Sequence, residues 1–256
     1  MGIAIPYMGT KRQLAYSVAE VVRTAQPGIF FDAFSGMCSV GQQVATTRQI
    51  WTNDIQVFAA QVAAALFTSV EPSIRAGRVF DLLYDRFDEH RQKLRRRVTK
   101  SLKAERQALD CTSFARFEAS RKALAHAFLA EAPRHPRRTG NLFLTRYANA
   151  FFGIRQSIEI DSIVHAIRSA SQSRLISKDE RRWLLIALGK VLLKASASPG
   201  HFAQFLKPKR TSFRTHIRQR RRRIWSEWTA ELDDLCSIGD PGWRKNNRAF
   251  IRREPL

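Results

Sequence analysis

Apolar and polar residues near the start of the chain follow a pattern that predicts a strand, a turn, a short helix and a second strand. The first strand is expected to end at Asp32, and the turn after it contains Gly36 and Gly41. A short helix is expected over residues 42–48 and a second strand over residues 49–53. This order is typical of the first βαβ unit of a nucleotide-binding α/β fold.

Beyond residue 54 the pattern changes to helical periodicity. One of these regions begins with Ser177-Lys178-Asp179-Glu180, which has the sequence of a capping box at a helix start. Loops that contain proline and glycine are expected at residues 132–140 and 198–201. The helical segments are expected at residues 57–66, 78–109, 154–167, 183–193 and 211–235.

The composition indicates a folded protein that attracts polyanions. Lys and Arg number 44 against 22 Asp and Glu, which gives a formal net charge of +22 and a sequence pI near 11.1. This charge exceeds what solubility requires and favours a nucleic-acid partner. Hydrophobic residues make up 44% of the chain and include 17 Phe, so a large core is expected, in one elaborated domain or two lobes.

Several classes of protein are disfavoured by the same composition. The three cysteines, Cys38, Cys111 and Cys236, are widely spaced and lack paired ligands, so neither a disulfide framework nor a metal site is expected. No charged-then-apolar export signal precedes Pro6, and the apolar run Trp183–Leu188 is too short to cross a bilayer. We therefore expect a cytoplasmic protein with no membrane segment.

Three nucleotide ligands compete for the glycine-containing turn. A phosphate-binding P-loop needs Lys and then Ser or Thr after the last glycine, but Gln42 and Gln43 follow Gly41. A dinucleotide turn has a third glycine, whereas bulkier residues crowd the turn here. The remaining candidate is S-adenosylmethionine, with Asp54 accepting hydrogen bonds from its ribose. The alternative stays open on these residues alone: ordinary turn glycines and a solvated Asp54.

Three motifs within the first 54 residues stand in an order that carries a family resemblance. They are Tyr7, Gly9, Lys11 and Arg12; then Asp32, Phe34, Gly36 and Val40; and then Asn53 and Asp54. In this order and spacing the chain resembles the Dam-like class of adenine-specific DNA methyltransferases. One departure is Cys38, which stands where that class usually has its second glycine. Phe34 is expected to be a packing residue whether or not the resemblance holds.

The resemblance implies a cofactor site for S-adenosylmethionine. By the pattern of the class, Tyr7 and Lys11 line the methionine end of the cofactor, Asp32 and Gly36 shape the turn beneath it, and Asp54 holds the ribose. The alternative for Lys11 is a surface charge beside a helix that begins near residue 13.

The fold implied by the same resemblance is α/β, a partial Rossmann-like methyltransferase sheet with a large helical, basic target-recognition insertion. The cofactor-binding part is expected at residues 1–60. The helical insertion is expected at residues 61–235, followed by a return toward the catalytic part at residues 236–256.

The densest positive run of the chain, residues 214–223, ends in Arg220, Arg221, Arg222 and Arg223. We expect these four arginines to bind DNA phosphates, although a charge run is more often a solvated helix face. Residues 141–153 mix aromatic, amide and basic side chains, which suits contact with unstacked bases. The alternative for the phenylalanines of this segment is a place in the core.

The catalytic Asp-Pro-Pro-Tyr motif of the class is missing, because the sequence contains no Pro-Pro pair. The nearest substitute, Gly239-Asp240-Pro241-Gly242-Trp243, is interpreted as a turn, so the catalytic residues stay unknown. We therefore expect the N-terminal part of a longer enzyme, a split subunit completed by a second polypeptide, or a truncated gene product.

The function implied is site-specific methyl transfer from S-adenosylmethionine to adenine N6 in DNA, as in restriction-modification systems. The alternatives are a non-catalytic, basic nucleic-acid-binding protein that retains a relic cofactor pocket, and an RNA methyltransferase.

Overall fold

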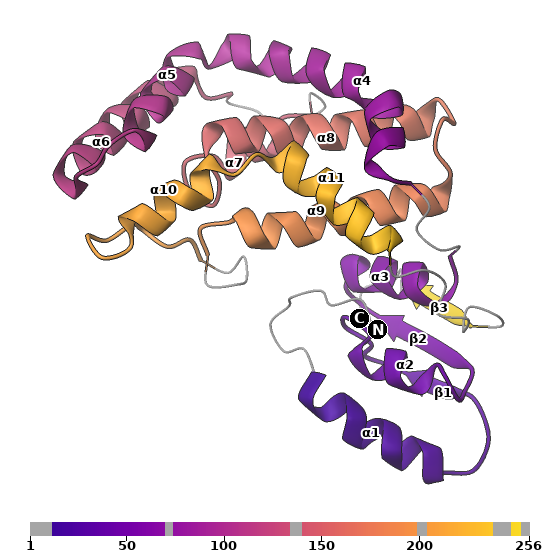
Figure 1. Ribbon diagram of the computed structural model, residues 1–256. Coiled ribbons are helices and arrows are strands. Elements are labelled where there is room, and N and C mark those ends of the chain that lie inside the picture. Colours follow the sequence, from indigo (N-terminus) through magenta and orange to yellow (C-terminus); the bar gives the residue numbers. More distant parts are fainter. Residues whose placement is uncertain (1–11, 70–73, 134–139, 199–203, 238–246, 252–256) are drawn as a thin grey trace. The chain divides into compact units, whose positions relative to one another are not determined.

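The computed structural model describes residues 12–69, 74–133, 140–198, 204–237 and 247–251 (Figure 1). The chain divides into two compact units. Unit 1 comprises residues 1–74, 177–187 and 232–256, and unit 2 comprises residues 75–176 and 188–231. Residues 177–187, expected in the helical insertion, are therefore grouped with the N-terminal part of the chain.

Unit 1 contains a small parallel sheet, which confirms the α/β expectation. Its strands are β1 (Phe30–Asp32), β2 (Ile50–Asp54) and β3 (Arg248–Ile251), in the order β1-β2-β3. Both pairings are parallel, with Phe31 opposite Trp51 and Trp51 opposite Arg248. Strand β3 was not predicted from the sequence and lies within residues 236–256, where a return toward the catalytic part was expected. The helices along this part of the chain are α1 (Arg12–Thr24), α2 (Ser39–Val44) and α3 (Val57–Phe67).

The two faces of this sheet differ in burial. Ile50 and Thr52 point to a face where they are fully buried. A Cβ added at Gly41 in α2 would lie 2.9 Å from the Phe67 ring of α3 and 3.8 Å from Ile50, so both helices pack closely on this face. Phe31 and Phe250, which belong to the other face, are 55% and 40% exposed. Parallel sheets normally carry cover on both faces, and the described residues cover only one.

Unit 2 is helical, and α8 lies at its centre (Figure 1). Helix α4 packs along α8, and α5 pairs with α6. Leu94, Leu144, Ile154 and Ile158 belong to one buried cluster that joins these helices. The bounds of the remaining helices, of which α9 and α11 contribute residues to both units, are α4 (Ala76–Arg97), α5 (Thr99–Leu109), α6 (Phe114–Glu131), α7 (Leu142–Arg146), α8 (Ile154–Gln172), α9 (Lys178–Ala195), α10 (Phe213–Arg221) and α11 (Ile224–Cys236).

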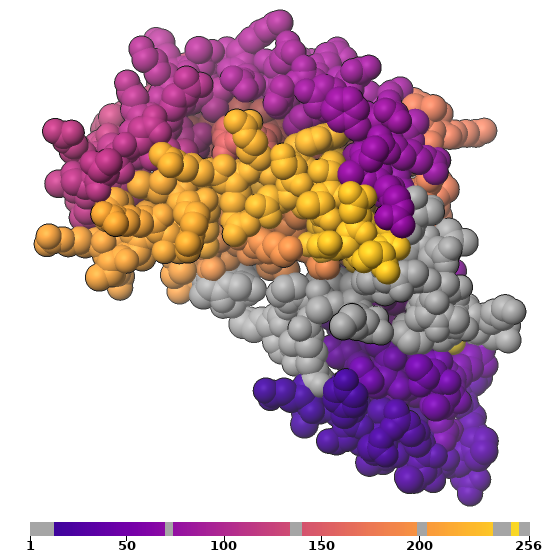
Figure 2. Space-filling view, viewed as in Figure 1, coloured from indigo at the N-terminus to yellow at the C-terminus, as the bar shows by residue number. Residues whose placement is uncertain are grey.

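The structure refines the predicted helices in two places. The basic stretch expected as one helix over residues 78–109 breaks at Val98, whose φ of −130° and ψ of 40° leave the helical region. The stretch 211–235 is likewise two helices, α10 and α11. Figure 2 shows α11 beside α4 on the surface of unit 2, where the Trp225 ring contacts Tyr84 and Phe87 at centroid distances of 5.5 and 4.2 Å.

Candidate functional site

The turn after β1 and the end of β2 are joined by a carboxylate. Asp54 Oδ2 accepts a hydrogen bond from the backbone N–H of Gly36 at 2.8 Å, and Asp54 Oδ1 accepts one from the N–H of Gln56 at 2.8 Å. The Asp54 side chain is buried, so both bonds form with little competition from water. Asn53 adds a second link, because its side-chain amide donates to the carbonyl of Ala33 at 3.3 Å.

The turn has an unusual backbone, because two of its residues are left-handed. Gly36 has φ 48°, which glycine adopts without steric cost. Cys38 has φ 61° and ψ 26°, although it carries a Cβ. This conformation explains why glycine suits the position at which the sequence departs from the Dam-like pattern. The N–H of Cys38 donates to the carbonyl of Ser35 at 2.7 Å, which closes the turn.

The Cys38 thiol lies close to two of the predicted site residues. Burial raises the pKa of Cys38 well above its usual range, and the negative charges of Asp32 and Asp54 raise it further, while a hydrogen bond with Ser35 opposes the shift. The thiol is therefore protonated at neutral pH and is a poor nucleophile. These effects also place Asp32 and Asp54 within electrostatic range of one buried atom.

Three of the five predicted cofactor residues are thus brought together: Asp32, Gly36 and Asp54. Tyr7 and Lys11 lie outside the described residues. Phe34, which was expected to pack, is instead 84% exposed. The prediction of a packing residue was therefore wrong.

The four arginines predicted to bind DNA differ in their surroundings. Arg220 is 5% exposed, and its guanidinium donates to the carbonyl of Ala150 at 2.5 Å. Burial lowers its pKa to about 10, although the nearby Glu105 carboxylate opposes this shift. This placement removes Arg220 from the surface on which a phosphate contact was expected. The sequence held a signal for it: Phe213, Ile217 and Arg220 recur at helical spacing, and all three are buried.

Arg221, Arg222 and Arg223 are more accessible than Arg220. Arg221 donates to the Leu109 carbonyl at 2.8 Å and pairs with Asp110 at 3.1 Å, while Arg222 pairs with Glu227 at 2.7 Å. Arg221 and Arg223 are exposed, and Arg222 is half-buried. These three keep their place as predicted phosphate-binding residues.

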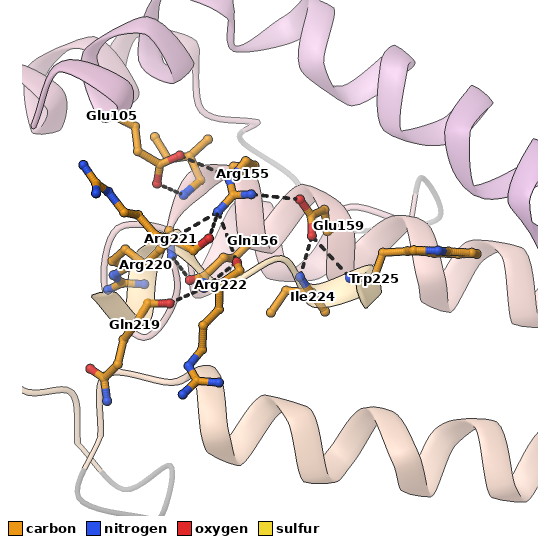
Figure 3. Close-up of polar contacts among 12 residues, drawn as sticks. Glu105, Arg155, Gln156, Glu159, Gln219, Arg220, Arg221, Arg222, Ile224 and Trp225 are labelled. Carbon is orange, nitrogen blue, oxygen red and sulfur yellow. Dashed lines mark hydrogen bonds and ion pairs between the residues drawn. The ribbon is translucent and has the colours of Figure 1, made fainter. Parts of the chain in front are cut away.

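A polar network fixes the turn between α10 and α11 against the start of α8 (Figure 3). Arg155 Nη2 donates to the carbonyls of Arg220, Arg221 and Arg222 at 3.1, 2.9 and 3.1 Å. These carbonyls close α10, where a positive charge is favoured by the helix dipole. Glu159 accepts from the N–H of Ile224 at 2.6 Å at the start of α11, and its other oxygen lies 3.5 Å from Arg155.

Glu105 closes the other end of this network. Its two oxygens accept hydrogen bonds from the N–H groups of Ile154 and Arg155, at 2.6 and 2.9 Å, and so satisfy donors at the start of α8. Burial raises the pKa of Glu105, while these bonds and the charge of Arg220 oppose the shift. A Cβ at Gly153 would lie 2.5 Å from Glu105 Oε1, so a larger residue there would displace this carboxylate oxygen from its present position.

The aromatic residues of the segment 141–153 pack against one another. Phe152 is fully buried, which confirms the core alternative for this residue. Its ring meets Phe143 at a centroid distance of 5.7 Å. Phe143 also contacts Tyr147 at 5.2 Å, and Phe151 contacts Phe205 at 5.8 Å.

In the described segments, no group of three or more His, Cys, Asp and Glu side chains lies close enough together to hold a metal ion. No helix in the same part of the chain has the length and apolar character to cross a membrane. The turn predicted at Gly239–Trp243 and the loop residue His201 lie outside the described residues.

Comparison with known proteins gives one match. Residues 7–127 match the family model of the D12 class N6 adenine-specific DNA methyltransferases. No curated protein and no solved structure matches the chain. The match confirms the resemblance to Dam-like adenine methyltransferases. It spans all three N-terminal motifs and continues through α4 and α5 into α6, whereas Arg220–Arg223 lie outside it.

Proposed function

We propose, from the match of residues 7–127 to the D12 class N6 adenine-specific DNA methyltransferases, that the chain binds S-adenosylmethionine and serves adenine N6 methylation of DNA. The observation that carries the proposal is the hydrogen bond from Gly36 N–H to Asp54. It joins the glycine turn to the acidic end of the second strand, the two elements that such a cofactor pocket requires. We further propose that the sheet is part of a Rossmann-like methyltransferase sheet.

The residues of the turn fit this cofactor. Each oxygen of a carboxylate has about two lone-pair positions, and each Asp54 oxygen accepts one described backbone N–H, so acceptor capacity remains for ribose hydroxyls. Gly36 adopts the left-handed backbone that the turn needs, and its lack of a side chain leaves room for the ligand. Tyr7 and Lys11 are proposed at the methionine end, with Asp32 shaping the turn, and the exposed Phe34 ring is available for an apolar contact.

The chemistry requires little of the protein besides positioning. S-adenosylmethionine supplies a sulfonium methyl group that the adenine N6 amine can attack in line. The chain holds the ribose through Asp54 and the turn through Gly36, which fixes the donor relative to the protein.

The 256-residue sequence contains no Asp-Pro-Pro-Tyr motif, so no binding site for the flipped adenine base is identified in it. The sheet face that the described residues of unit 1 leave exposed has an open cavity of about 520 Å³ lined by Ile29, Phe31, Trp51, Asn53 and Phe250. Because a parallel sheet is normally covered on both faces, we propose that further strands and helices, supplied by a second polypeptide with the catalytic motif, complete this side.

Cofactor binding is the test of the proposed function. We expect Asp54→Ala to lower the affinity for S-adenosylmethionine by about 1.5–3 kcal/mol in calorimetry, the range for charge-assisted hydrogen bonds. The matched control is Asp179→Ala, which removes another carboxylate of unit 1 whose Oδ1 accepts from Arg182 at 2.7 Å. Equal affinity in a folded Asp54→Ala protein would contradict the ribose assignment.

Two alternative functions give different results in the same experiments. A non-catalytic nucleic-acid-binding protein with a relic pocket would bind DNA and release no heat on titration with S-adenosylmethionine. An RNA methyltransferase binds the cofactor and prefers RNA to duplex DNA of the same sequence.

A further inference from the structure

A basic groove lies on unit 2, along the end of α4, the length of α5 and the turn after α10. It consists of two adjoining hollows of about 360 and 410 Å³, which share Arg95, Leu102 and Arg106 on their walls. Besides the half-buried Arg155, the cations that line this basic groove are Arg95, Arg96, Lys103, Arg106, Arg221 and Arg223. All six are exposed, so their charges are available to a ligand from solvent.

The acidic residues in the basic groove offset the charge of Arg221 and leave the other five exposed cations without an acidic partner among the described residues. Glu105 is buried, and both its oxygens accept backbone N–H groups of α8. Asp110 is paired with Arg221. Within the described segments the structure gives no ion pair to Arg95, Arg96, Lys103, Arg106 or Arg223, and the hollow at the α4–α5 end contains no acidic residue at all.

The walls of the basic groove are held in place by the network described above. Arg155, which lines the deeper hollow, holds the carbonyls of Arg220–Arg222 and so fixes the backbone that carries Arg221 and Arg223 (Figure 3). On the other wall, Lys103 and Arg106 stand one turn apart on α5. A fixed backbone lowers the entropy cost of placing several cations along one ligand.

We propose that the basic groove binds the phosphodiester backbone of duplex DNA. A row of exposed cations over two linked hollows suits a chain of phosphates better than a single anion, because duplex DNA carries one negative charge per ~1.7 Å of its axis. The choice of DNA as the polyanion rests on the proposed function. The sequence predicted DNA recognition by the helical insertion 61–235 and named only Arg220–Arg223 as phosphate-binding residues, and the basic groove adds named residues of α4 and α5 to these.

The test removes two charges from the basic groove and two from elsewhere in the same unit. The groove variant is Arg95→Gln with Arg106→Gln, since these arginines line both hollows. The control is Arg168→Gln with Arg174→Gln, two exposed arginines 13 and 19 residues along the chain from Arg155. Binding of the full chain to a duplex is measured by fluorescence anisotropy over a series of salt concentrations, after melting curves have established that both variants are folded.

The groove variant is expected to bind at least about tenfold more weakly at low salt. Its log–log salt slope should become shallower by about 1.8, at ~0.9 for each phosphate released. The control should keep the wild-type slope. Equal changes in both variants would show a general charge effect and overturn the proposal, as would an unchanged groove variant.

Two further measurements separate the possible failures. If the groove variant loses affinity for duplex RNA while keeping its affinity for DNA, the assignment to DNA is overturned. Calorimetry with S-adenosylmethionine on the wild-type chain tests the proposed function independently. A chain that shows the groove effect and binds no cofactor refutes the methyltransferase function and leaves the groove in place.

Discussion

Cys38 has a left-handed backbone conformation that favours glycine. The stability of variants at this position therefore depends on backbone strain in the folded state and on the conformational entropy of the unfolded chain. A left-handed L-residue costs about 1–2 kcal/mol, whereas glycine costs about 0.5–1 kcal/mol through the entropy of the unfolded chain. We therefore expect Cys38→Gly to be more stable than Cys38→Ala by about 0.5–1 kcal/mol, the reverse of the usual order. Both variants lose the buried sulfur, so the cavity effect is similar in the two. Urea unfolding curves measure the difference.

Ala45 provides the matched control for this comparison. It is also buried in the same unit, but its φ is −61° and ψ −19°, which is ordinary for alanine. Ala45→Gly should therefore destabilise the protein, by roughly 1 kcal/mol. A Cys38→Gly protein that is less stable than Cys38→Ala would show that the left-handed turn carries no strain.

At the residue scale, the sequence motifs predicted which residues belong to the candidate site better than they predicted how deeply each residue is buried. The Asp54–Gly36 link follows from parallel strands, because the ends of adjacent strands meet at one edge of a sheet. The burial of Arg220 depends on Glu105, which is 115 positions earlier in the sequence, and on the carbonyl of Ala150. A charge run therefore indicated the sign of the ligand and not which of its members is free to contact it.

Among the elements, α7 depends on one buried carboxylate. Asp161 on α8 accepts hydrogen bonds from the N–H groups of Phe143 and Leu144 at 2.9 and 2.8 Å, which are donors at the start of α7. Burial raises the pKa of Asp161 to about 7, although these bonds oppose the shift. The folded pKa lies above the unfolded value, so the protonated form of Asp161 is favoured in the folded state. Its contribution to the free energy of unfolding is complete below about pH 4 and is lost as the pH rises through 7.

Asp161→Asn removes this titration and tests the sign. We expect the stability advantage of the wild type over Asp161→Asn to be largest near pH 4 and to shrink toward pH 8, measured by urea unfolding at each pH. An advantage that grows with pH would show that the two backbone bonds outweigh burial and keep the carboxylate ionised.

Elements with local signals were predicted well, and elements set by packing were not. The capping box is confirmed: Ser177 N–H donates to Glu180 at 2.7 Å, and Glu180 N–H donates to Ser177 Oγ at 3.1 Å. Both partners lie within one turn, so the sequence contains the whole motif. The break between α4 and α5 occurs at Val98, which is fully buried in a cluster with residues from α6 to α8. No local residue type marked that break.

On the scale of the whole molecule, the sequence order hides the arrangement of the sheet. Strand β3 pairs with β2 across nearly the full chain, with Ala249 opposite Thr52. Hydrophobic periodicity depends on residues that are close together in the sequence. A four-residue strand that pairs with a distant segment therefore could not be predicted from it. The composition of unit 1 was hidden for the same reason, because its three segments lie far apart along the chain.

The whole chain also carries the prediction about catalysis. Positioning the adenine amine toward a sulfonium methyl requires a site that grips the flipped base, and no such motif stands in the sequence. The purified chain is therefore expected to bind methyl-labelled S-adenosylmethionine and DNA and to transfer no label. Adding a polypeptide that carries the further strands and an Asp-Pro-Pro-Tyr motif should restore transfer to adenine. If the chain alone methylates DNA and Asp240→Ala abolishes that activity, the turn at Gly239–Trp243 is the catalytic loop and the chain needs no partner.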